Sequence, residues 1–323
     1  MAVENQITAT HRFFVLLLLS LYLIPGHSAA QKIVSLSEEK NISLRGLSAV
    51  TDQIIWVCGT GGTVARSTDG GFHWEWMTVK GFEQTDFRDI EAFDANTAVI
   101  MGISRPAYLL RTEDGGRHWE IVYQDSAQGV FLDAMTFAGA TGYVVGDPLE
   151  GHPYLYRAVT RDAGRSWKKL TSDSSYLFLE KGEALFASSG TNAVVFSPPK
   201  KKSASDLILT VTGGIFSSLL HSGYPQKIPL PILQGRSSTG ANSLAAWNKN
   251  QLLICGGDFA NDQDTSANCF WSKDGGLHWN RPAIPPHGYR SCVAYINSSI
   301  LVACGTSGVD VSFDRGRTWK LID

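Results

Sequence analysis

The stretch Ser67-Thr-Asp-Gly-Gly-Phe-His-Trp74 decides the fold, because it recurs along the chain with a fixed pattern. The pattern is S/T-x-D-x-G-x-x-W, and its further copies begin at Thr112, Thr160, Ser272 and Ser312. Five matches without a mismatch exclude chance recurrence. A chain that repeats a short motif at intervals of about 20 to 50 residues folds as an array of similar units.

Each octet has the chemistry of a tight turn. It lies between two apolar, β-rich runs, as between Tyr108–Arg111 and Trp119–Tyr123. The recurring glycine tolerates positive φ, which a tight hairpin requires. The recurring aspartate can accept backbone N–H groups across the turn, as in an Asx-turn. We therefore predict that these aspartates lock hairpins, with a metal-binding or catalytic role as the alternative: Asp69, Asp114, Asp162, Asp274 and Asp314.

The spacing of the octets gives the number of units. Their Trp residues, at positions 74, 119, 167, 279 and 319, are 45, 48, 112 and 40 residues apart, so one unit inside the gap of 112 has lost its octet. The six units start near Arg45, Arg88, Leu132, Glu183, Asn242 and Arg290. Four short strands per unit are typical of β-propeller blades. We predict an all-β propeller of six blades, each of four antiparallel strands, with seven blades as the alternative.

The unit without an octet is placed by alignment. Glu183–Ser197 aligns with Arg88–Gly102, which makes Ala193–Phe196 a second strand. Leu207–Val211 is expected to be the third strand, and a shortened turn at Ser217–Tyr224 is expected before the last strand. Lys32–Leu36 is a candidate for an additional strand that helps to close the ring.

Composition excludes two broad classes. The 323 residues include 28 Lys+Arg and 30 Asp+Glu, a net charge of −2, and 43% of them are hydrophobic. This hydrophobic content excludes disorder across the whole chain. The balanced charge argues against a nucleic-acid binder, which usually carries a basic excess. The 32 Gly residues and 11% aromatic residues suit an all-β chain with many turns.

The N-terminus has the pattern of a secretory signal peptide. His11 and Arg12 precede the apolar run Phe13–Ile24, and Ser28-Ala29-Ala30 supplies small residues for cleavage. The alternative, a membrane anchor, needs about 20 apolar residues to span the hydrocarbon core, and this run is shorter. We predict a signal peptide over residues 1–30 and an exported propeller domain over 31–323, periplasmic or secreted.

The five cysteines leave at least one thiol without an intramolecular partner. An oxidising compartment permits disulfides. Cys292 with Cys304, or Cys255 with Cys269, would bridge neighbouring strands, and the sequence does not choose between these pairs. The chain has no close CxxC pair, so we expect no zinc site, and no motif indicates any other metal or a cofactor.

The loops that join the second and third strands carry most of the irregular sequence. These are Gly59–Gly62, Gly102–Pro106, Gly146–Pro153, Ser197–Asp206, Gly256–Asn268 and Gly305–Gly308. Long loops on a rigid scaffold are the usual place for binding. The first strands begin at the same face, which predicts a ring of binding residues around the central mouth: Arg45, Arg88, Glu183, Asn242 and Arg290. The alternative is that these arginines form ion pairs between blades.

Some loop carboxylates are candidates for acid–base catalysis. They are Asp147 and Glu150 in one loop, Asp258 in another, and Glu183. The alternative is that they are solvated loop acids. The basic run Lys200–Lys202 is expected to be a solvated loop tip.

The octets, the repeat number and the Gly146-Asp-Pro and Gly256-Gly-Asp loops resemble two related groups. One is the sialidase superfamily, in which the octet is called the Asp-box or BNR repeat. The other is the exported propellers of the photosystem II stability/assembly factor family. The resemblance covers residues 44–322. It implies the propeller fold more strongly than any activity, because the octet is architectural.

The two resemblances imply different functions. Sialidase chemistry implies a Phe/Tyr-Arg-Ile-Pro segment, and both Leu44–Leu47 and Phe87–Ile90 lack its proline. It also implies a Tyr–Glu pair, for which Tyr289 and Glu183 are the positions available. The assembly-factor family implies an arginine-rich patch that binds a protein, which falls on Arg45, Arg88 and Arg290.

We therefore predict a non-catalytic exported propeller that acts as a binding, assembly or stability factor. Its loop-rich face would bind a protein partner or an anionic or carbohydrate ligand. We expect a monomer without cofactor, nucleic-acid partner or membrane span after signal cleavage. The alternative function is a carbohydrate-active hydrolase, that is, a sialidase-like glycosidase.

Overall fold

The computed structural model describes residues 33–36, 42–103, 106–171, 174–198 and 205–322. The predicted signal peptide and Lys200–Lys202 lie outside these ranges. The chain divides into two units, Met1–Val34 and Ser35–Asp323, and the following description concerns the second.

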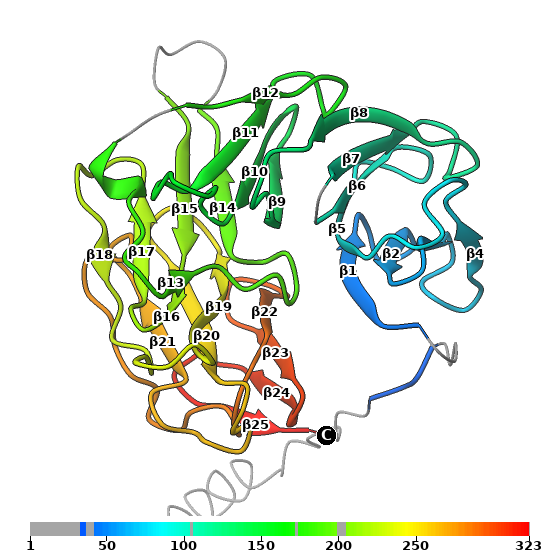
Figure 1. Cartoon of the computed structure of the whole chain (residues 1–323). Coiled ribbons are helices and arrows are strands. Elements are labelled where there is room, and N and C mark those ends of the chain that lie inside the picture. Colours follow the sequence, from blue (N-terminus) through cyan, green and yellow to red (C-terminus); the bar gives the residue numbers. More distant parts are fainter. Residues whose placement is uncertain (1–32, 37–41, 104–105, 172–173, 199–204, 323) are drawn as a thin grey trace, which may run out of the picture. The chain divides into compact units, whose positions relative to one another are not determined.

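Six antiparallel sheets follow one another along the chain, and we number them as blades 1 to 6 (Figure 1). Blade 1 consists of β1 (Leu44–Ala49), β2 (Ile55–Gly59), β3 (Thr63–Ser67) and β4 (Glu75–Thr78). Blade 2 consists of β5 (Phe87–Ala92), β6 (Ala98–Gly102), β7 (Ala107–Thr112) and β8 (Glu120–Asp125). Blade 3 consists of β9 (Leu132–Ala138), β10 (Thr141–Gly146), β11 (Tyr156–Thr160) and β12 (Lys168–Lys169). Blade 4 consists of β14 (Ala193–Phe196), β15 (Leu207–Val211), β17 (Ser218–His221) and β18 (Ile228–Pro229). Blade 6 consists of β22 (Cys292–Tyr295), β23 (Leu301–Gly305), β24 (Gly308–Ser312) and β25 (Lys320–Leu321).

Blade 5 varies this plan. Its strands β19 (Thr239–Ala246), β20 (Leu252–Asp258) and β21 (Cys269–Ser272) are extended at the inner edge by β16 (Gly213–Gly214) and β13 (Glu183–Ala184). At its outer edge, an isolated bridge joins Trp271 and Asn280. One short 3-10 helix, η1 (Ser175–Leu177), precedes β13. The predicted all-β propeller of six four-stranded blades is confirmed, with this local variation.

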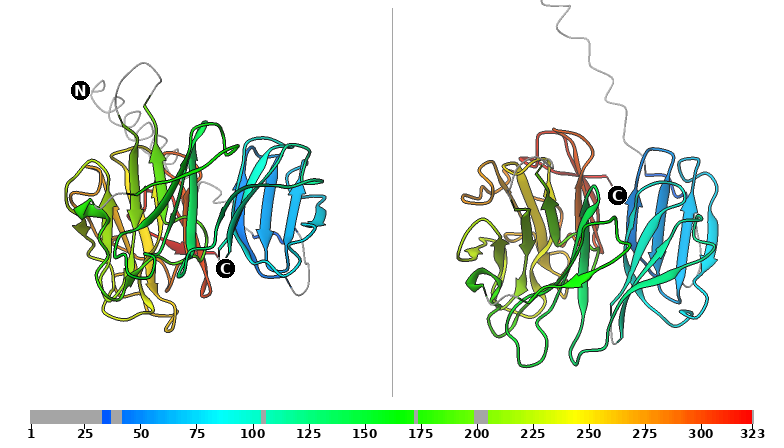
Figure 2. Two further views of the ribbon diagram at one scale, coloured as in Figure 1. Left: turned by 45° about the horizontal axis from the view of Figure 1, so that its top comes forward. Right: turned by 90° about the horizontal axis from the view of Figure 1, so that it is seen from above.

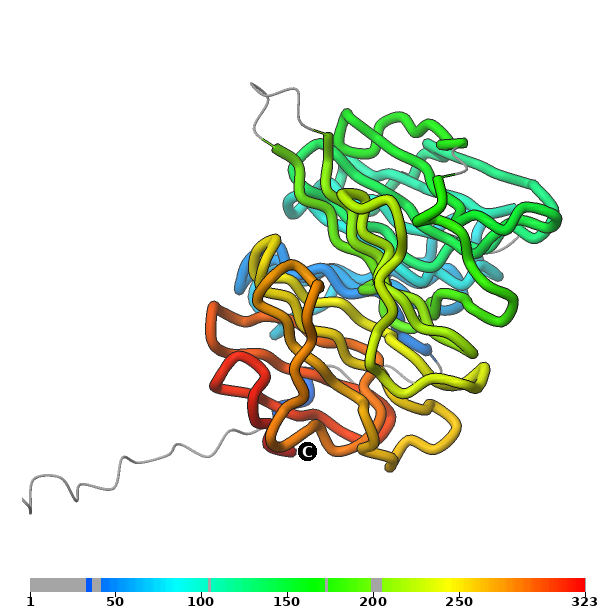
Figure 3. The backbone as a smooth tube through the Cα atoms, turned by 90° about the vertical axis from the view of Figure 1, so that its left-hand side faces the viewer, coloured from blue at the N-terminus to red at the C-terminus, as the bar shows by residue number. Residues whose placement is uncertain are grey.

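The first strand of each blade is its inner strand. β1 packs against β5, β5 against β9, β9 against β14, β14 against β19, and β19 against β22. The side views show the strands running between two faces, with loops at both ends (Figure 2). Blades 3 to 5 follow one another in sequence order (Figure 3).

The first and last blades differ from the other neighbours. Within the described part of the chain, β1 and β22 make no packing comparable to that of the other inner strands. Leu47 on β1 and Ile296 after β22 are correspondingly 66% and 64% exposed. Residues 33–36 form no strand, but the Leu36 side chain lies against Gly71 of the first octet. In blades 2, 3, 5 and 6, that glycine instead lies against the preceding blade.

All five octets form the same hydrogen-bonded hairpin. In the first, Gly71 N–H donates to Ser67 Oγ at 2.8 Å, and His73 N–H donates to Asp69 Oδ1 at 2.9 Å. The glycine has a φ of +91°, a left-handed conformation that glycine adopts without a steric penalty. The same two bonds occur at Asp114, Asp162, Asp274 and Asp314. These contacts are those of turn locks.

The strand assignment of blade 4 was wrong in two respects. Ser217–Tyr224 is not a shortened turn, because it contains β17, with Leu219 and Leu220 both buried. Ala193–Phe196 is the innermost strand of its sheet rather than the second, and Glu183 belongs to the sheet of blade 5. Without an octet, the sequence offers no fixed point for the register, and two adjacent buried leucines do not show the alternation of a strand with one exposed face.

Both predicted cysteine pairs face each other in adjacent strands. Cys255 is paired in register with Cys269, and Cys292 with Cys304, and all five thiols are free. No helix in the described ranges is long and apolar enough to cross a membrane.

Candidate partner-binding face

One face of the propeller collects the predicted binding loops, with one exception. On this face each inner strand begins opposite the end of the second strand, as the pairs Leu44 with Gly59, Phe87 with Gly102 and Leu132 with Gly146 show. The connections that follow the second strands therefore start here. We call this the loop face. The exception, Ser197–Asp206, follows the first strand of blade 4 rather than the second, so this loop begins at the opposite face, where Asp206 binds Arg161 of an octet.

A β-bulge recurs where the inner strands begin. The ladder skips one residue in each of blades 1, 2, 3 and 5, and these residues are Arg45, Arg88, Asp133 and Asn242. A bulged residue is released from the ladder, which redirects its side chain. In blade 6 the Cα of Arg290 lies beside Gly305 as the Cα of Leu44 lies beside Gly59, so Ser291 is the equivalent of the bulged residue. The bulge ring is therefore Arg45, Arg88, Asp133, Asn242 and Ser291.

Arg290 consequently lies one residue away from the bulge ring. Its side chain is fully enclosed and forms an ion pair with Asp310, to which Nε donates at 2.9 Å. Nη1 donates to the carbonyl of Tyr289 at 2.8 Å and to Ser307 Oγ at 2.5 Å. Arg290 therefore does not join Arg45 and Arg88 in the predicted ring. A difference of one residue in register turns a side chain to the other face of a strand.

Glu183 does not begin the inner strand of blade 4 as predicted, because it lies on β13 at the inner edge of the sheet of blade 5. It is 5% exposed and accepts hydrogen bonds from Lys227 Nζ at 2.5 Å and Thr212 Oγ1 at 2.6 Å. Burial alone would raise the pKa of Glu183, but these hydrogen bonds outweigh burial and hold the pKa below its ordinary value. The carboxylate is therefore ionised and engaged within the fold.

Arg88 joins the bulge ring to a segment from the middle of the chain. Its Nε donates to Asp86 Oδ2 at 2.7 Å, and its Nη1 donates to the carbonyl of Ala187 at 3.0 Å. Its side chain is 24% exposed. Nη2 makes no hydrogen bond with any described residue. Arg88 is thus anchored on one side while keeping donors for a ligand.

The segment that Arg88 contacts runs between β13 and β14 through the middle of the ring (Figure 1). We call Leu185–Thr191 the central segment. Ser189 Oγ donates to the carbonyl of Ser291 at 2.8 Å, and Thr191 Oγ1 donates to Ser243 Oγ at 2.7 Å. The Asn242 amide nitrogen lies 3.5 Å from Ser188 Oγ. The central segment therefore ties blades 2, 5 and 6 together.

Two carboxylates form an acidic site beside Arg88. Asp133 is completely buried, and neither carboxylate oxygen has a hydrogen-bond partner among the described residues. Burial, and secondly the charge of Asp147, raise the pKa of Asp133 well above its ordinary value. Asp147 Oδ1 accepts the N–H of Leu185 at 2.9 Å, and burial raises the pKa of Asp147 as well.

The other proposed acids lie in separate settings. Asp258 is 2% exposed and accepts the N–H of Ala260 at 2.9 Å, with Arg236 Nη1 at 3.5 Å. A hydrogen bond from Ser238 is the main reason that its pKa is lowered. Glu150 is exposed in its loop. The four candidate catalytic residues thus lie in different surroundings.

Arg45 is the least constrained charged group of the bulge ring. Its side chain makes no hydrogen bond or ion pair with any residue in the described ranges, and its Nε is shielded from solvent. The side chain is half-buried on β1. A shielded donor without a partner is costly, so a ligand that accepts its hydrogen bonds would be favoured.

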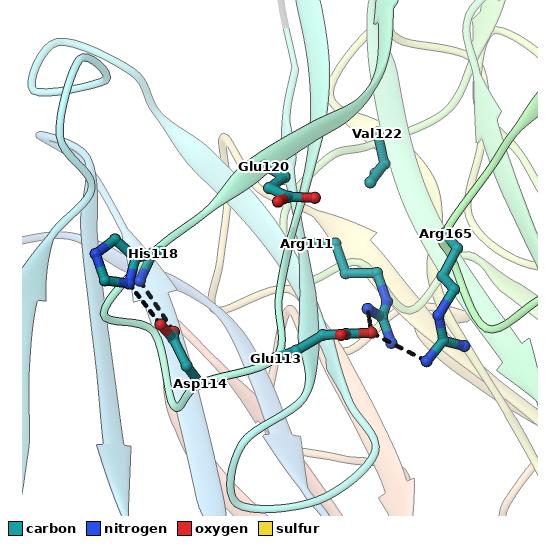
Figure 4. Close-up of a pocket in the computed structure, with 7 residues that line it drawn as sticks. All are labelled: Arg111, Glu113, Asp114, His118, Glu120, Val122 and Arg165. Carbon is teal, nitrogen blue, oxygen red and sulfur yellow. Dashed lines mark hydrogen bonds and ion pairs between the residues drawn. The ribbon is translucent and has the colours of Figure 1, made fainter.

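A polar pocket of about 370 Å³ lies beside the octets of blades 2 and 3, away from the bulge ring (Figure 4). Its charges pair with one another: Glu113 binds Arg111 and also accepts Arg165 Nη2 at 3.0 Å. His118 lies 2.6 Å from Asp114 within the octet. Sequence analysis did not predict this pocket, because it is formed by side chains of two neighbouring blades.

Comparison with known proteins supports the fold. No family model matches the chain, and no curated protein matches it. Similar solved structures include YCF48 bound to D1 peptide, with 15% identity, a TM-score of 0.55 and coverage of 88% of this chain and 81% of that chain. YCF48 from Cyanidioschyzon merolae has 17% identity, a TM-score of 0.55 and coverages of 88% and 87%.

A further similar structure is the WD40 β-propeller domain of Doa1, with 13% identity, a TM-score of 0.55 and coverages of 88% and 83%. At these identities the likeness is one of fold. The resemblance to the sialidase superfamily remains a prediction.

Proposed function

We propose that this chain is an exported, non-catalytic propeller that binds an acidic segment of a protein partner on its loop face and so acts in assembly or stability. The unpaired guanidinium of Arg45 carries this proposal. Arginine presents a planar fork of donors that suits carboxylates, and no carboxylate of the described residues pairs with Arg45.

Arg88 would be the second contact, through its Nη2, while its Nε and Nη1 keep the side chain in place. Arg290 has no part in this binding, because its guanidinium is enclosed. The structure of YCF48 bound to D1 peptide, which has a similar fold, supports a peptide-binding role for a propeller of this kind. WD40 propellers provide a second case of fold similarity.

The test uses acidic peptides that carry a fluorophore, with binding followed by anisotropy. We expect saturable binding that weakens with salt, because charged contacts are screened. Arg45→Ala combined with Arg88→Ala should weaken binding by about tenfold or more, since hydrogen bonds to charged groups contribute about 1.5 to 3 kcal/mol each. The matched control is Arg165→Ala, which removes an arginine bound to Glu113 among the octets.

The proposal fails if the double variant binds acidic peptides as tightly as the unmodified chain. A double variant with a strongly lowered melting temperature would instead support the alternative in which these arginines stabilise the blades. Export has its own test, because N-terminal sequencing of the protein from its native envelope should begin at Gln31.

A further inference from the structure

The seams between blades follow a rule to which blade 3 is the exception. On the third strand, the residue three positions before the octet packs toward the next blade. Val64 packs in one cluster with Phe87 and Ile90 of blade 2. Leu109 packs with Leu132 of blade 3, and Cys269 packs with Val293 of blade 6. The equivalent residue of blade 3 is Arg157.

The apolar seam between blades 3 and 4 is divided at Arg157. Leu155 belongs to one buried cluster, together with Leu220 of blade 4. Val159 packs against another cluster, which contains Tyr143 and Ile208. Because alternate residues of a strand share a face, Leu155, Arg157 and Val159 point to the same side of β11. A guanidinium therefore separates two apolar clusters.

Within the described ranges, no carboxylate neutralises the charge of Arg157. The residue is 8% exposed, and Nη1 donates to the hydroxyl of Tyr176 at 3.3 Å. Nε is buried without a hydrogen-bond partner, and no carboxylate of the described residues forms an ion pair with it. Burying a charge without a counter-charge is unfavourable, so this position creates a demand for an anion.

The carboxylate of Asp206, which lines the same pocket as Arg157, already has other partners. Asp206 accepts hydrogen bonds from Ser197 Oγ at 2.7 Å and from Tyr143 at 2.8 Å, and it also binds Arg161. These partners lower the pKa of Asp206 against the opposing effect of burial. Asp206 thus neutralises Arg161 and leaves Arg157 uncompensated.

The missing octet of blade 4 explains why a pocket exists here. In the second strand, Trp56, Val99 and Leu253 occupy equivalent places, and each lies against the octet glycine of the next blade. Tyr143 is the equivalent residue of blade 3, and blade 4 has no octet to cover it. A pocket of about 360 Å³ lies at this place, and its polar lining includes Tyr143, Arg157, Arg161, Tyr176, Asp206 and Ser222.

We propose that this pocket binds a small oxyanion group, that is, a phosphate, sulfate or carboxylate, between blades 3 and 4. Arg157 supplies the buried charge. Arg161, whose side chain is 58% exposed, supplies further donors at the opening. The site is distinct from the loop-face contacts of Arg45 and Arg88, so it stands or falls independently of the proposed partner binding.

The experiment is calorimetric titration of the whole purified chain with inorganic phosphate, sulfate and acetate, at ionic strength kept constant with sodium chloride. We expect at least one of these anions to bind with a stoichiometry of one. Arg157→Leu restores the residue type that blade 2 has at this place, and it should weaken binding by about tenfold or more. Arg165→Leu, the matched control, should leave binding unchanged.

Two results would overturn the site. One is that none of the three anions binds to the unmodified chain. The other is that Arg157→Leu binds as tightly as the Arg165→Leu control. Should Arg157→Leu fail to fold, Arg157→Lys provides the measurement instead: it keeps the charge but loses the planar fork, so it should bind the anion more weakly than arginine, and unchanged affinity would contradict the proposal.

Discussion

Arg290, just before the inner strand of blade 6, and Arg157, on the third strand of blade 3, are both buried arginines with different surroundings. Arg290 is fully enclosed, and Asp310, two backbone carbonyls and Ser307 satisfy its guanidinium. Among the residues that the structure describes, the guanidinium of Arg157 has only the neutral hydroxyl of Tyr176 as a partner. The first arrangement is complete without a ligand, whereas the second lacks an anion. Burial of a charged residue therefore indicates a binding site only when its partners have been accounted for.

Removing the partner of Arg290 should have the largest effect on stability. Asp310→Ala would leave a fully buried guanidinium without its counter-charge, and we expect a loss of about 3 to 5 kcal/mol in the free energy of unfolding. His287 would also lose the carboxylate that accepts its N–H at 2.9 Å. Urea denaturation of the variant and of the exposed control Asp52→Ala would measure the difference.

An Asp310→Ala variant as stable as the control would remove the distinction between the two arginines. A combined Arg290→Met and Asp310→Leu variant tests whether the loss of stability comes from the unpaired charge rather than from the lost ion pair. Replacing a whole buried ion pair by apolar residues is often neutral or stabilising, so this double variant should be more stable than Asp310→Ala alone.

Asp133 extends the comparison to a buried carboxylate that forms no ion pair with any described residue. Its pKa is raised in the folded protein, so the folded state holds this proton more tightly than the unfolded state does. The corresponding stability is present below the ordinary pKa of about 3.9 and is lost as pH rises through the folded-state pKa. Asp133→Asn removes this titration. We expect the free energy of unfolding of this variant at pH 8 to exceed that of the unmodified chain by about 1 to 3 kcal/mol.

The measurement is the free energy of unfolding at pH 5 and pH 8. The gain of Asp133→Asn over the unmodified chain should be larger at pH 8, while Asp52→Asn, on an exposed loop, should show no such difference. An equal effect of Asp133→Asn at both pH values would mean that the folded carboxyl is already ionised at pH 5, as it is in the unfolded chain, and would contradict a raised pKa.

The fold could be predicted because the octet carries its own geometry. Asp69 and its counterparts fix one hairpin in five of the six blades, and the spacing then gives the blade number. Blade 4 was misassigned because it lacks this fixed point. Its strand β17 buries both Leu219 and Leu220, so the alternation that would have revealed it is absent.

The candidate site was only partly predictable. Arg45, Arg88 and Asn242 were placed correctly on the bulge ring, but blades 3 and 6 were aligned one residue out of register, so Asp133 and Ser291 occupy the places expected for Leu132 and Arg290. Bulges leave little trace in a single sequence. The central segment and the unpaired Arg157 depend on contacts between distant parts of the chain, which local patterns do not encode.

The smallest expected effect concerns a carboxylate that is paired at the surface. Asp162 accepts hydrogen bonds from Ser166 N–H at 2.9 Å, Ser166 Oγ at 2.6 Å and Thr160 Oγ1 at 2.7 Å. Burial is the largest single influence and opposes ionisation, but these hydrogen bonds together prevail and lower the pKa of Asp162 to about 2. Asp162→Ala should cost about 1 kcal/mol at pH 7, the typical net contribution of a hydrogen bond.

A lowered pKa contributes stability above the ordinary value of about 3.9, and this contribution is lost as pH falls through about 2. The difference between Asp162→Ala and the unmodified chain should therefore shrink between pH 4 and pH 2, which is the opposite direction to Asp133→Asn. Denaturation curves across this range would show it. A difference that stays constant to pH 2 would mean that the turn depends on the shape of the side chain rather than on its charge.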